Sequence, residues 1–189
     1  MRRRIFIAIN LPRDIRENFA SYQEKWPEFP AKWTRKENLH ITLFFAGHIS
    51  DEELFEISKI AKQVAGRHRP FPINLDKICY GPPGKMPPRM IWALGEKSED
   101  FSELRKDLEE SLVSCSRISV STEEKNSCPH ITLARIRKWE WQRVEPEEMP
   151  QIEQALGLNF PAESIEIMES ELKRGGAKYT ALESHNLGG

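Results

Sequence analysis

The chain has 189 residues, of which 39% are hydrophobic and 30% are charged, and its formal net charge at pH 7 is −1. This composition is typical of a globular domain with enough apolar side chains to bury a core, and it argues against an intrinsically disordered chain. The balanced charge argues against binding to nucleic acid through the overall field, so an anionic ligand would need a local positive patch. We expect residues 1–189 to form a single domain with two lobes.

Two features bear on the cellular compartment. The apolar segment 5–9 follows three arginines, but it is too short for a secretion signal or a membrane span, and polar residues follow at once. The three cysteines, Cys79, Cys115 and Cys128, are an odd number and lack the spacing of metal ligands. We therefore expect a cytoplasmic protein with reduced thiols, without a metal and without membrane contact.

Strand-like and helix-like segments alternate in chain order. Residues 4–10 are predicted to form a buried strand, and Pro12 then marks a helix start. A strand over residues 39–46 follows, and Ser50 with Glu53 predicts a capping box at the start of the next helix. The apolar positions at helical spacing are Ile15, Phe19, Tyr22 and Trp26 in the first helix, and Leu54, Ile57, Ala61 and Val64 in the second.

The second half of the chain continues this alternation. Strands are predicted over residues 73–80 and 90–94, with a glycine- and proline-rich loop between them. A helix with Phe101, Leu104, Leu108 and Leu112 on one face and a strand over residues 131–136 come next. Trp139 and Trp141 lie either on a half-exposed strand edge or on an RNA-contacting rim, and a short helix with Met149, Ile152 and Leu156 is expected after them. A hairpin around Gly175 and Gly176 and a frayed end over residues 184–189 complete the predicted elements.

The tetrapeptide His-Ile-Thr-Leu occurs twice, at residues 40–43 and 130–133. Side chains alternate faces along a strand, so His40 and Thr42 share one face, while Ile41, Leu43 and Phe45 are predicted to face the core. In the same way, His130 and Thr132 share a face. One copy in each half of the chain indicates an internal duplication with two facing lobes.

Two imidazoles and two hydroxyls around a common point suit the opening of a cyclic phosphate. Water attacks phosphorus in line with the departing oxygen, so a proton acceptor and a proton donor are needed on opposite sides. Histidine serves both roles near neutral pH, and threonine hydroxyls can stabilise the non-bridging oxygens. A single His-x-Thr is usually structural, but two copies among five histidines favour catalysis.

The paired strands resemble the signature of the two-histidine phosphoesterases, and more narrowly of the RNA 2′,3′-cyclic phosphodiesterases, also called 2′-5′ RNA ligases. The resemblance extends nearly from end to end. Its segments are residues 4–12, Lys32-Trp33 with residues 37–43, residues 88–92, residues 129–135, and Glu171-Leu172 with residues 175–179. The chain departs from the family at Phe44-Phe45-Ala46-Gly47, where a lysine is frequent in place of Phe44, and at His48, for which a structural role next to the helix cap is favoured.

The resemblance implies an α+β, bilobal fold with pseudo-twofold symmetry, in which two antiparallel sheets face a central cleft and the helices lie outside. It implies hydrolysis of RNA 2′,3′-cyclic phosphate ends to 2′-phosphates without a cofactor or metal. His40 would be the proton donor to the leaving 3′ oxygen, and His130 would be the proton acceptor that activates water. RNA ends or cyclic nucleotides would be the substrates, and a monomer without an obligate protein partner would suffice.

Four further residues are candidates for substrate binding. Arg135 would bind the phosphate by the same resemblance, although strict alternation places it on the core side unless the strand ends or bulges. Arg89 is either a second anionic anchor or an ordinary surface arginine. Trp33 either stacks on a nucleobase or packs in the core, and Tyr179 is a further candidate for stacking.

Three other functions compete with hydrolysis. ATP-independent 2′-5′ RNA ligation would use the same catalytic strands, so the sequence does not separate it from hydrolysis. A non-catalytic module that binds RNA ends or nucleotides would not require both histidines and both threonines. A histidine-ligated metal hydrolase is disfavoured, because the sequence lacks His-x-x-His, His-Glu-x-x-His and cysteine-cluster motifs.

Overall fold

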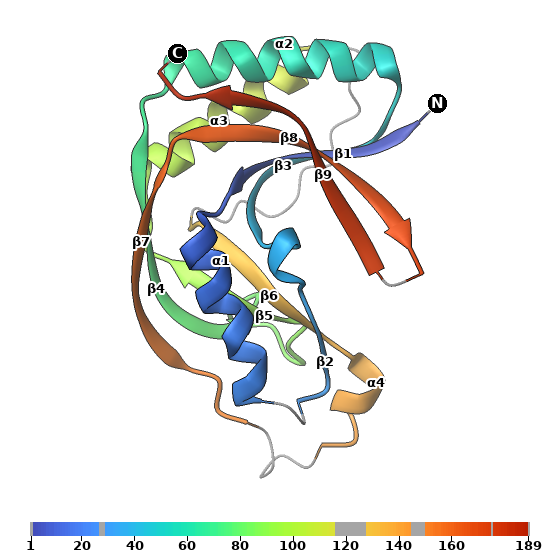
Figure 1. Ribbon diagram of the computed structural model, residues 1–189, viewed down its shortest axis with the longest axis vertical. Coiled ribbons are helices and arrows are strands. Elements are labelled where there is room, and N and C mark those ends of the chain that lie inside the picture. The colour runs from blue at the N-terminus through green and yellow to red at the C-terminus, as the bar shows by residue number, and fades with distance from the viewer. Residues whose placement is uncertain (1, 27–28, 116–127, 145–149, 175, 189) are drawn as a thin grey trace.

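The described part of the chain is built on one antiparallel sheet of nine strands (Figure 1). The computed structural model describes residues 2–26, 29–115, 128–144, 150–174 and 176–188. The strands are β1 (Arg3–Asn10), β2 (Ala31–Trp33), β3 (His40–Ile49), β4 (Phe71–Gly81), β5 (Met90–Gly95), β6 (His130–Ile136), β7 (Gln154–Ala162), β8 (Ser164–Lys173) and β9 (Gly176–Asn186).

Helices connect the strands of this sheet along the chain. They are α1 (Arg13–Ala20), η1 (Ser21–Lys25), η2 (Lys36–Asn38), α2 (Asp51–Arg67), α3 (Glu99–Val113) and α4 (Lys138–Trp141). The predicted capping box is confirmed, because Ser50 accepts a hydrogen bond from the Glu53 backbone and the Glu53 carboxylate accepts one from the Ser50 backbone. In Figure 1, α2 and α3 lie together at the top, and each also packs against strands of the sheet.

The two copies of the repeated tetrapeptide lie at the centre of the sheet. The strand order is β7-β4-β5-β6-β3-β1-β8-β9, with β2 paired to β6. The central strands β3 and β6 are antiparallel and are joined at the pair Ile41 and Ile131. The predicted α+β fold is confirmed. The two expected sheets are two halves of one curved sheet, each of which contributes one copy of the repeat to this junction.

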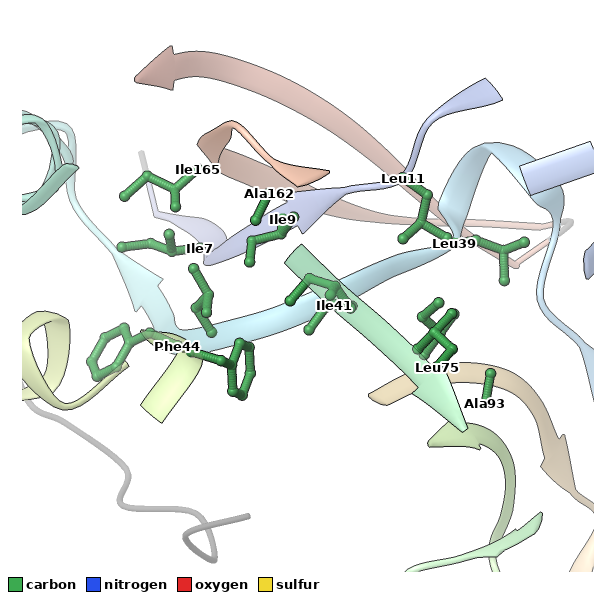
Figure 2. Close-up of a cluster of buried hydrophobic side chains, with 14 of the residues drawn as sticks. Ile7, Ile9, Leu11, Leu39, Ile41, Phe44, Leu75, Ala93, Ala162 and Ile165 are labelled. Carbon is green, nitrogen blue, oxygen red and sulfur yellow. The ribbon is translucent and has the colours of Figure 1, made fainter. Parts of the chain in front are cut away.

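A continuous hydrophobic core fixes the orientation of the repeated strands. Ile41 and Ile131 are fully buried in this core. Figure 2 shows Ile41 among side chains from β1, β3, β4 and β5, including Ile9 and Leu75. Because successive side chains in a strand point to opposite faces, the histidine and threonine next to each isoleucine must point away from this core.

Both central strands contain a β-bulge directly after the threonine. Thr42 and Phe44 pair with the adjacent residues Ala8 and Ile7 of β1, so Leu43 is the extra residue. In β6, Thr132 and Ala134 likewise pair with adjacent residues of β5, so that Leu133 is the extra residue. After each bulge, the residues that would have faced the core by strict alternation face the opposite side of the sheet. The prediction that Phe45 faces the core is therefore wrong: Phe44 is buried, and Phe45 is 36% exposed.

Three other expectations on local structure are wrong. Residues 150–153 have no regular structure and Gln154–Ala162 form β7, so there is no helix at Ile152 and Leu156, whereas Met149 lies outside the described residues. The expected strand edge at residues 139–141 is instead the short helix α4.

The expected frayed end is also ordered. β9 continues to Asn186, the Leu187 side chain is buried, and the Gly188 backbone donates a hydrogen bond to the Ala65 carbonyl. The predicted terminal hairpin is confirmed by the pairing of β8 and β9, although Gly175 itself lies outside the described residues.

Candidate active site

The four residues of the two His-x-Thr motifs line one cleft of about 1100 Å³. The antiparallel pairing of Ile41 with Ile131 sets their arrangement. In such a pair, the residues that flank the paired positions lie opposite each other crosswise. His40 therefore lies alongside Thr132, and Thr42 lies alongside His130. The duplicated sequence thus becomes two histidine–threonine pairs that meet across the junction of the two half-sheets.

His40 is held in a defined tautomer. Its Nδ1 lies 2.7 Å from the carbonyl oxygen of Asn38, and its Nε2 lies 3.0 Å from the hydroxyl oxygen of Thr42. A carbonyl oxygen only accepts hydrogen bonds, so Nδ1 carries the proton and the neutral ring keeps its lone pair on Nε2. The Thr42 hydroxyl donates to this lone pair. Nε2 is therefore the nitrogen that can accept a proton from the cleft.

Aromatic rings surround His40. The Phe6 ring centroid lies 4.9 Å from that of the imidazole, and the Tyr179 ring packs edge-on against the imidazole at 5.3 Å. Phe6 and Tyr179 also contact each other at 5.0 Å. These contacts limit the rotation of the imidazole and remove it from water. Tyr179, predicted as a substrate-binding residue, lines the cleft next to His40.

His130 is stacked on Trp92. The two ring centroids are 4.0 Å apart, with 26° between the ring planes. Burial of the imidazole lowers the pKa of His130 to about 4, against the opposing effect of a hydrogen bond with the Cys128 backbone. The positive charges of Arg105 and of protonated His40 lower this pKa further. His130 is therefore neutral at pH 7 and can accept a proton.

The electrostatics of His40 follow the same principle. Burial lowers its pKa, the hydrogen bond with the Asn38 backbone raises it, and the positive charge of Arg135 lowers it. Both imidazoles are thus held in the neutral form when the cleft contains no anion. An anionic group between them would favour the protonated form, so binding of a phosphate and protonation of one histidine are coupled.

The charged side chains in the cleft are mostly basic. Five basic side chains and one acidic side chain line it in the described part of the chain, namely Arg4, Lys85, Arg89, Arg105 and Arg135 against Glu109. This excess of four positive charges contrasts with the net charge of −1 for the whole chain. It is the local positive patch that an anionic ligand requires.

Arg135 belongs to the cleft because of the bulge at Leu133. The bulge returns Arg135 to the face of His130 and Thr132, and its Nη1 lies 3.9 Å from Sδ of Met90. Within the described residues, its guanidinium pairs with no carboxylate. The Thr132 hydroxyl oxygen lies at the same distance from this sulfur. Arg135 and Thr132 therefore flank one point in the cleft, and Arg89 lines the cleft just before Met90.

Trp33 is not part of the cleft. Its ring stacks on Trp26, with parallel planes and centroids 6.2 Å apart, at the edge of the hydrophobic core. The pairing of β2 with β6 explains this position, because Trp33 lies opposite the buried Ala134, whereas Lys32 lies opposite Arg135. Of the four predicted binding residues, Arg135, Arg89 and Tyr179 therefore line the cleft with the two motifs, and Trp33 does not.

Sequence reasoning did not single out the basic residues Arg4, Lys85 and Arg105, and it also missed residues around the two histidines. Trp92 supports His130, Asn38 holds His40, and Phe45 and His48 line the cleft. The bulge at Leu43 turns Phe45 towards the cleft, whereas strict alternation predicted it in the core. The second bulge, at Ala46, returns His48 to the face that strict alternation gives it together with His40, although a structural role next to the helix cap was favoured for it. The signal for Asn38 was its position, since it is a polar residue two positions before the first histidine, at the end of η2 and just before β3.

Within the described residues, no three side chains of His, Cys, Asp or Glu converge as metal ligands. In the same part of the chain, no helix has the length and apolar character needed to cross a membrane.

Comparisons with known proteins agree with this geometry. A family model described as LigT like Phosphoesterase matches residues 9–92. The RNA 2′,3′-cyclic phosphodiesterase of Thermus thermophilus is 32% identical, and the alignment covers 98% of this chain and 91% of that protein. The RNA 2′,3′-cyclic phosphodiesterase of Thermotoga maritima is also 32% identical, with 95% of this chain and 92% of that protein covered.

Solved structures show the same similarity over the whole fold. The crystal structure of TT0787 from Thermus thermophilus has a TM-score of 0.82 and 31% identity, and 98% of both chains is covered. The structure of Escherichia coli LigT complexed with 3′-AMP has a TM-score of 0.77 and 26% identity, with 99% of both chains covered. From the duplicated motif, the shared fold and these identities, it follows that the chain belongs to the family of LigT-like phosphoesterases.

Proposed function

We propose that this protein hydrolyses the 2′,3′-cyclic phosphate ends of RNA to 2′-phosphomonoesters. The observation that carries the proposal is the convergence of two histidine–threonine pairs in one basic cleft. The relatives from Thermus thermophilus and Thermotoga maritima, which span nearly the whole chain, are RNA 2′,3′-cyclic phosphodiesterases. Escherichia coli LigT has been crystallised with 3′-AMP and with phosphate, which are a nucleotide and an anion of the kind this cleft suits.

In the proposed reaction, His130 is the general base and His40 is the general acid. Nε2 of neutral His130 takes a proton from water as the water oxygen bonds to phosphorus, and the bond between phosphorus and the 3′ oxygen breaks. Protonated His40 donates its Nε2 proton to that 3′ oxygen. The pKa of about 4 for His130 supports its role as the base, since it is unprotonated at pH 7. One proton exchange with solvent restores the initial state.

The threonines and Arg135 stabilise the phosphate in this mechanism. Each threonine lies alongside the histidine of the other motif, so the two hydroxyls can donate hydrogen bonds to the two non-bridging oxygens. Arg135 adds a positive charge close to Thr132. Acid–base catalysis contributes about 10²–10⁴-fold, so the remaining acceleration must come from this electrostatic stabilisation and from positioning.

RNA ligation is the second candidate activity. If a 5′ hydroxyl takes the place of water, the same displacement of the 3′ oxygen gives a 2′-5′ phosphodiester without ATP. The cleft extends past the histidines in both directions, towards Arg4 on one side and Lys85 on the other, which leaves room for a second strand. Reaction of a cyclic-phosphate RNA with a 5′-hydroxyl RNA tests this activity, since a longer product resistant to 3′-5′ specific cleavage would support it.

We also infer that residues 1–189 act as one monomeric domain in the cytoplasm. The sheet is continuous through β3 and β6, and both motifs that line the cleft come from the same chain, which supports a self-contained catalytic unit. The three cysteines are free thiols, which agrees with a reducing compartment. Light scattering during size-exclusion chromatography tests the monomer, and a dimer mass would contradict it.

The experiment for the proposed function uses an RNA with a 2′,3′-cyclic phosphate end and an excess of EDTA. We expect turnover by the wild-type protein and loss of at least about 10²-fold in kcat for His40→Ala and for His130→Ala. His68→Ala is the matched control, because His68 pairs with Asp107 outside the cleft. Circular dichroism establishes that the variants are folded. Loss of activity on chelation, or unchanged turnover in either active-site variant, would contradict the proposal.

A further inference from the structure

One end of the cleft shows a regular order of side chains along β3 and β1. Three pairs of residues lie side by side on these strands: Thr42 with Ala8, Phe45 with Phe6, and His48 with Arg4. All of them except the fully buried Ala8 line the cleft. Because Leu43 and Ala46 are bulged, every third residue of β3 pairs with every second residue of β1 over this stretch. From the reacting centre outward, the cleft floor is therefore polar, then aromatic, then basic.

The spacing of this order suits a nucleotide. Neighbouring pairs are about 7 Å apart along β1, at about 3.3–3.4 Å per residue, so the backbone of the Arg4 and His48 pair lies about 13 Å from that of Thr42. The two phosphates of one nucleotide are closer together than this, so the long side chain of Arg4 has to point back along the strand to meet the 5′ phosphate. The rings of Phe6 and Phe45 are 6.1 Å apart between these positions. Aromatic side chains are the usual platform for an unpaired base at an RNA end.

Arg4 and His48 are available for a ligand. Both side chains are exposed and line the cleft, and neither forms a side-chain hydrogen bond or an ion pair within the described residues. The neighbouring Arg3 differs, since it lies on the other face of β1 and pairs with Asp51 at 3.3 Å. Arg105 and Glu109 of α3, which packs against β3, also line the cleft, so the environment of Arg4 contains both a second arginine and one carboxylate.

We propose that Arg4 and His48 form a second anion subsite, which binds the phosphate on the 5′ oxygen of the terminal nucleoside. This inference rests on the proposed function, because it takes the cyclic phosphate to lie between His40 and His130. The terminal nucleoside then lies over Phe45, which packs on the buried Phe6, and the next phosphate along the strand reaches the basic pair. The subsite makes the enzyme select a 5′-phosphorylated end over a free nucleoside 2′,3′-cyclic phosphate.

The opposite end of the cleft has a different chemistry. Arg135 lies there beside Thr132, and its charge acts on His40, which assigns it to the reacting phosphate. Lys85 and Arg89 lie farther along that side with Pro82 and Pro83 in place of phenylalanines. A nucleobase therefore has its aromatic platform on the Arg4 side, which decides the direction of the RNA strand in the cleft.

The test compares three substrates that share the same terminal base. They are a nucleoside 2′,3′-cyclic phosphate with a 5′ hydroxyl, its 5′-phosphomonoester, and the dinucleotide in which that phosphate is a diester. We expect kcat/KM to be about tenfold higher for both 5′-phosphorylated substrates than for the 5′-hydroxyl substrate, as one charge-assisted hydrogen-bonded contact provides. A preference for both supports the subsite, because the monoester and the diester each carry an anion on the 5′ oxygen. A preference for the monoester alone would contradict the binding of a phosphate within an RNA strand.

The variants locate the subsite. The preference is the ratio of kcat/KM for a 5′-phosphorylated substrate to kcat/KM for the 5′-hydroxyl substrate. Arg4→Gln should lower this ratio about tenfold and His48→Ala a few-fold. Arg3→Gln, the matched control on the other face of β1, should leave it unchanged. Equal kcat/KM for all three wild-type substrates would overturn the subsite while leaving the proposed function intact. Loss of the preference in Arg89→Gln instead of Arg4→Gln would also overturn it. Absence of turnover on every substrate would reject the proposed function itself.

Discussion

The carbonyl oxygen of Asn38 accepts a hydrogen bond from Nδ1 of His40 at 2.7 Å, and the side chain of the same asparagine holds β9. Its Nδ2 donates to the Ala177 carbonyl at 2.7 Å, and its Oδ1 accepts from the Tyr179 backbone at 3.3 Å. One buried residue therefore fixes the tautomer of His40 and the strand that carries the neighbouring Tyr179 ring. Asn38 touches no reacting atom, so it is a positioning residue.

Replacement of Asn38 with alanine should lower both stability and activity. The change leaves the Ala177 carbonyl and the Tyr179 amide without their partner, which costs about 1–3 kcal/mol in the free energy of unfolding. We expect kcat/KM to fall about tenfold, since Tyr179 is no longer held against His40. Urea denaturation and steady-state kinetics measure the two effects. A stable variant with normal kcat/KM would show that the Asn38 side chain does not position the site.

The pH dependence of kcat/KM should have its maximum on the acidic side of pH 6.5. Activity needs one protonated and one neutral imidazole, and burial lowers the pKa of both His40 and His130. Above the higher of the two pKa values, the free enzyme loses its proton donor, so kcat/KM should fall about tenfold for each pH unit. A maximum well above pH 7 would contradict the burial of the two rings.

Arg135→Gln should move the alkaline limb of this profile to higher pH. The positive charge of Arg135 lowers the pKa of His40, so its removal raises that pKa and keeps the donor protonated at higher pH. The height of the profile also falls, because the phosphate loses a contact. Arg89→Gln is the control, for which we expect no displacement of the limb. A limb that stays in place in Arg135→Gln would remove the proposed coupling.

The low pKa of His130 predicts a loss of stability in acid. The unfolded chain binds a proton near pH 6.5, whereas folded His130 binds one only at about pH 4. The unfolded state therefore holds more protons between these values, and stability falls as the pH drops from about 6.5 to about 4, by up to about 3 kcal/mol. Urea denaturation at both ends of this range should show a smaller loss for His130→Asn than for the wild type. An equal loss would contradict the prediction.

Gly81 leaves space for the indole of Trp92, which in turn stacks on His130. A Cβ atom at this position would meet the indole of Trp92 at 2.7 Å or less, and this indole stacks on His130. Gly81→Ala should therefore displace Trp92, cost about 1–3 kcal/mol by overpacking, and lower kcat. Gly157→Ala is the matched control, because an added Cβ there has open space. Normal activity of Gly81→Ala would show that the position of Trp92 does not matter for His130.

The two motifs of the site were predictable because each is a short segment whose side-chain directions depend only on its own strand. Two His-Ile-Thr-Leu segments in strands place histidine and threonine on one face and isoleucine on the other, whatever the partner strands are. The class of fold was implied by the resemblance of the motifs, in their order and spacing, to the two-histidine phosphoesterases. The α+β fold is found in the structure, as is the shared face of each histidine and threonine.

The expectations that were wrong, and the alternatives that the sequence left open for Arg135 and Trp33, depend on which strands pair. The bulges that turn Phe45 and Arg135 towards the cleft exist only in the pairing of β3 with β1 and of β6 with β5. Residues 154–162 extend as β7 because they pair with β4, which overrides the helical spacing of a few apolar residues. Trp33 packs on Trp26 because β2 pairs with β6. Long-range partners of this kind leave no local signal.

The most direct measurement uses a cyclic substrate in which sulfur replaces the 3′ oxygen. A thiolate leaves without a proton, so this substrate does not need a general acid, but the attacking water still needs a general base. We predict that sulfur substitution restores the activity of His40→Ala by about 10²-fold or more relative to the oxygen substrate, and that it does not restore His130→Ala. Rescue of His130→Ala alone would reverse the two roles. Rescue of neither variant would contradict acid–base catalysis by this pair of histidines.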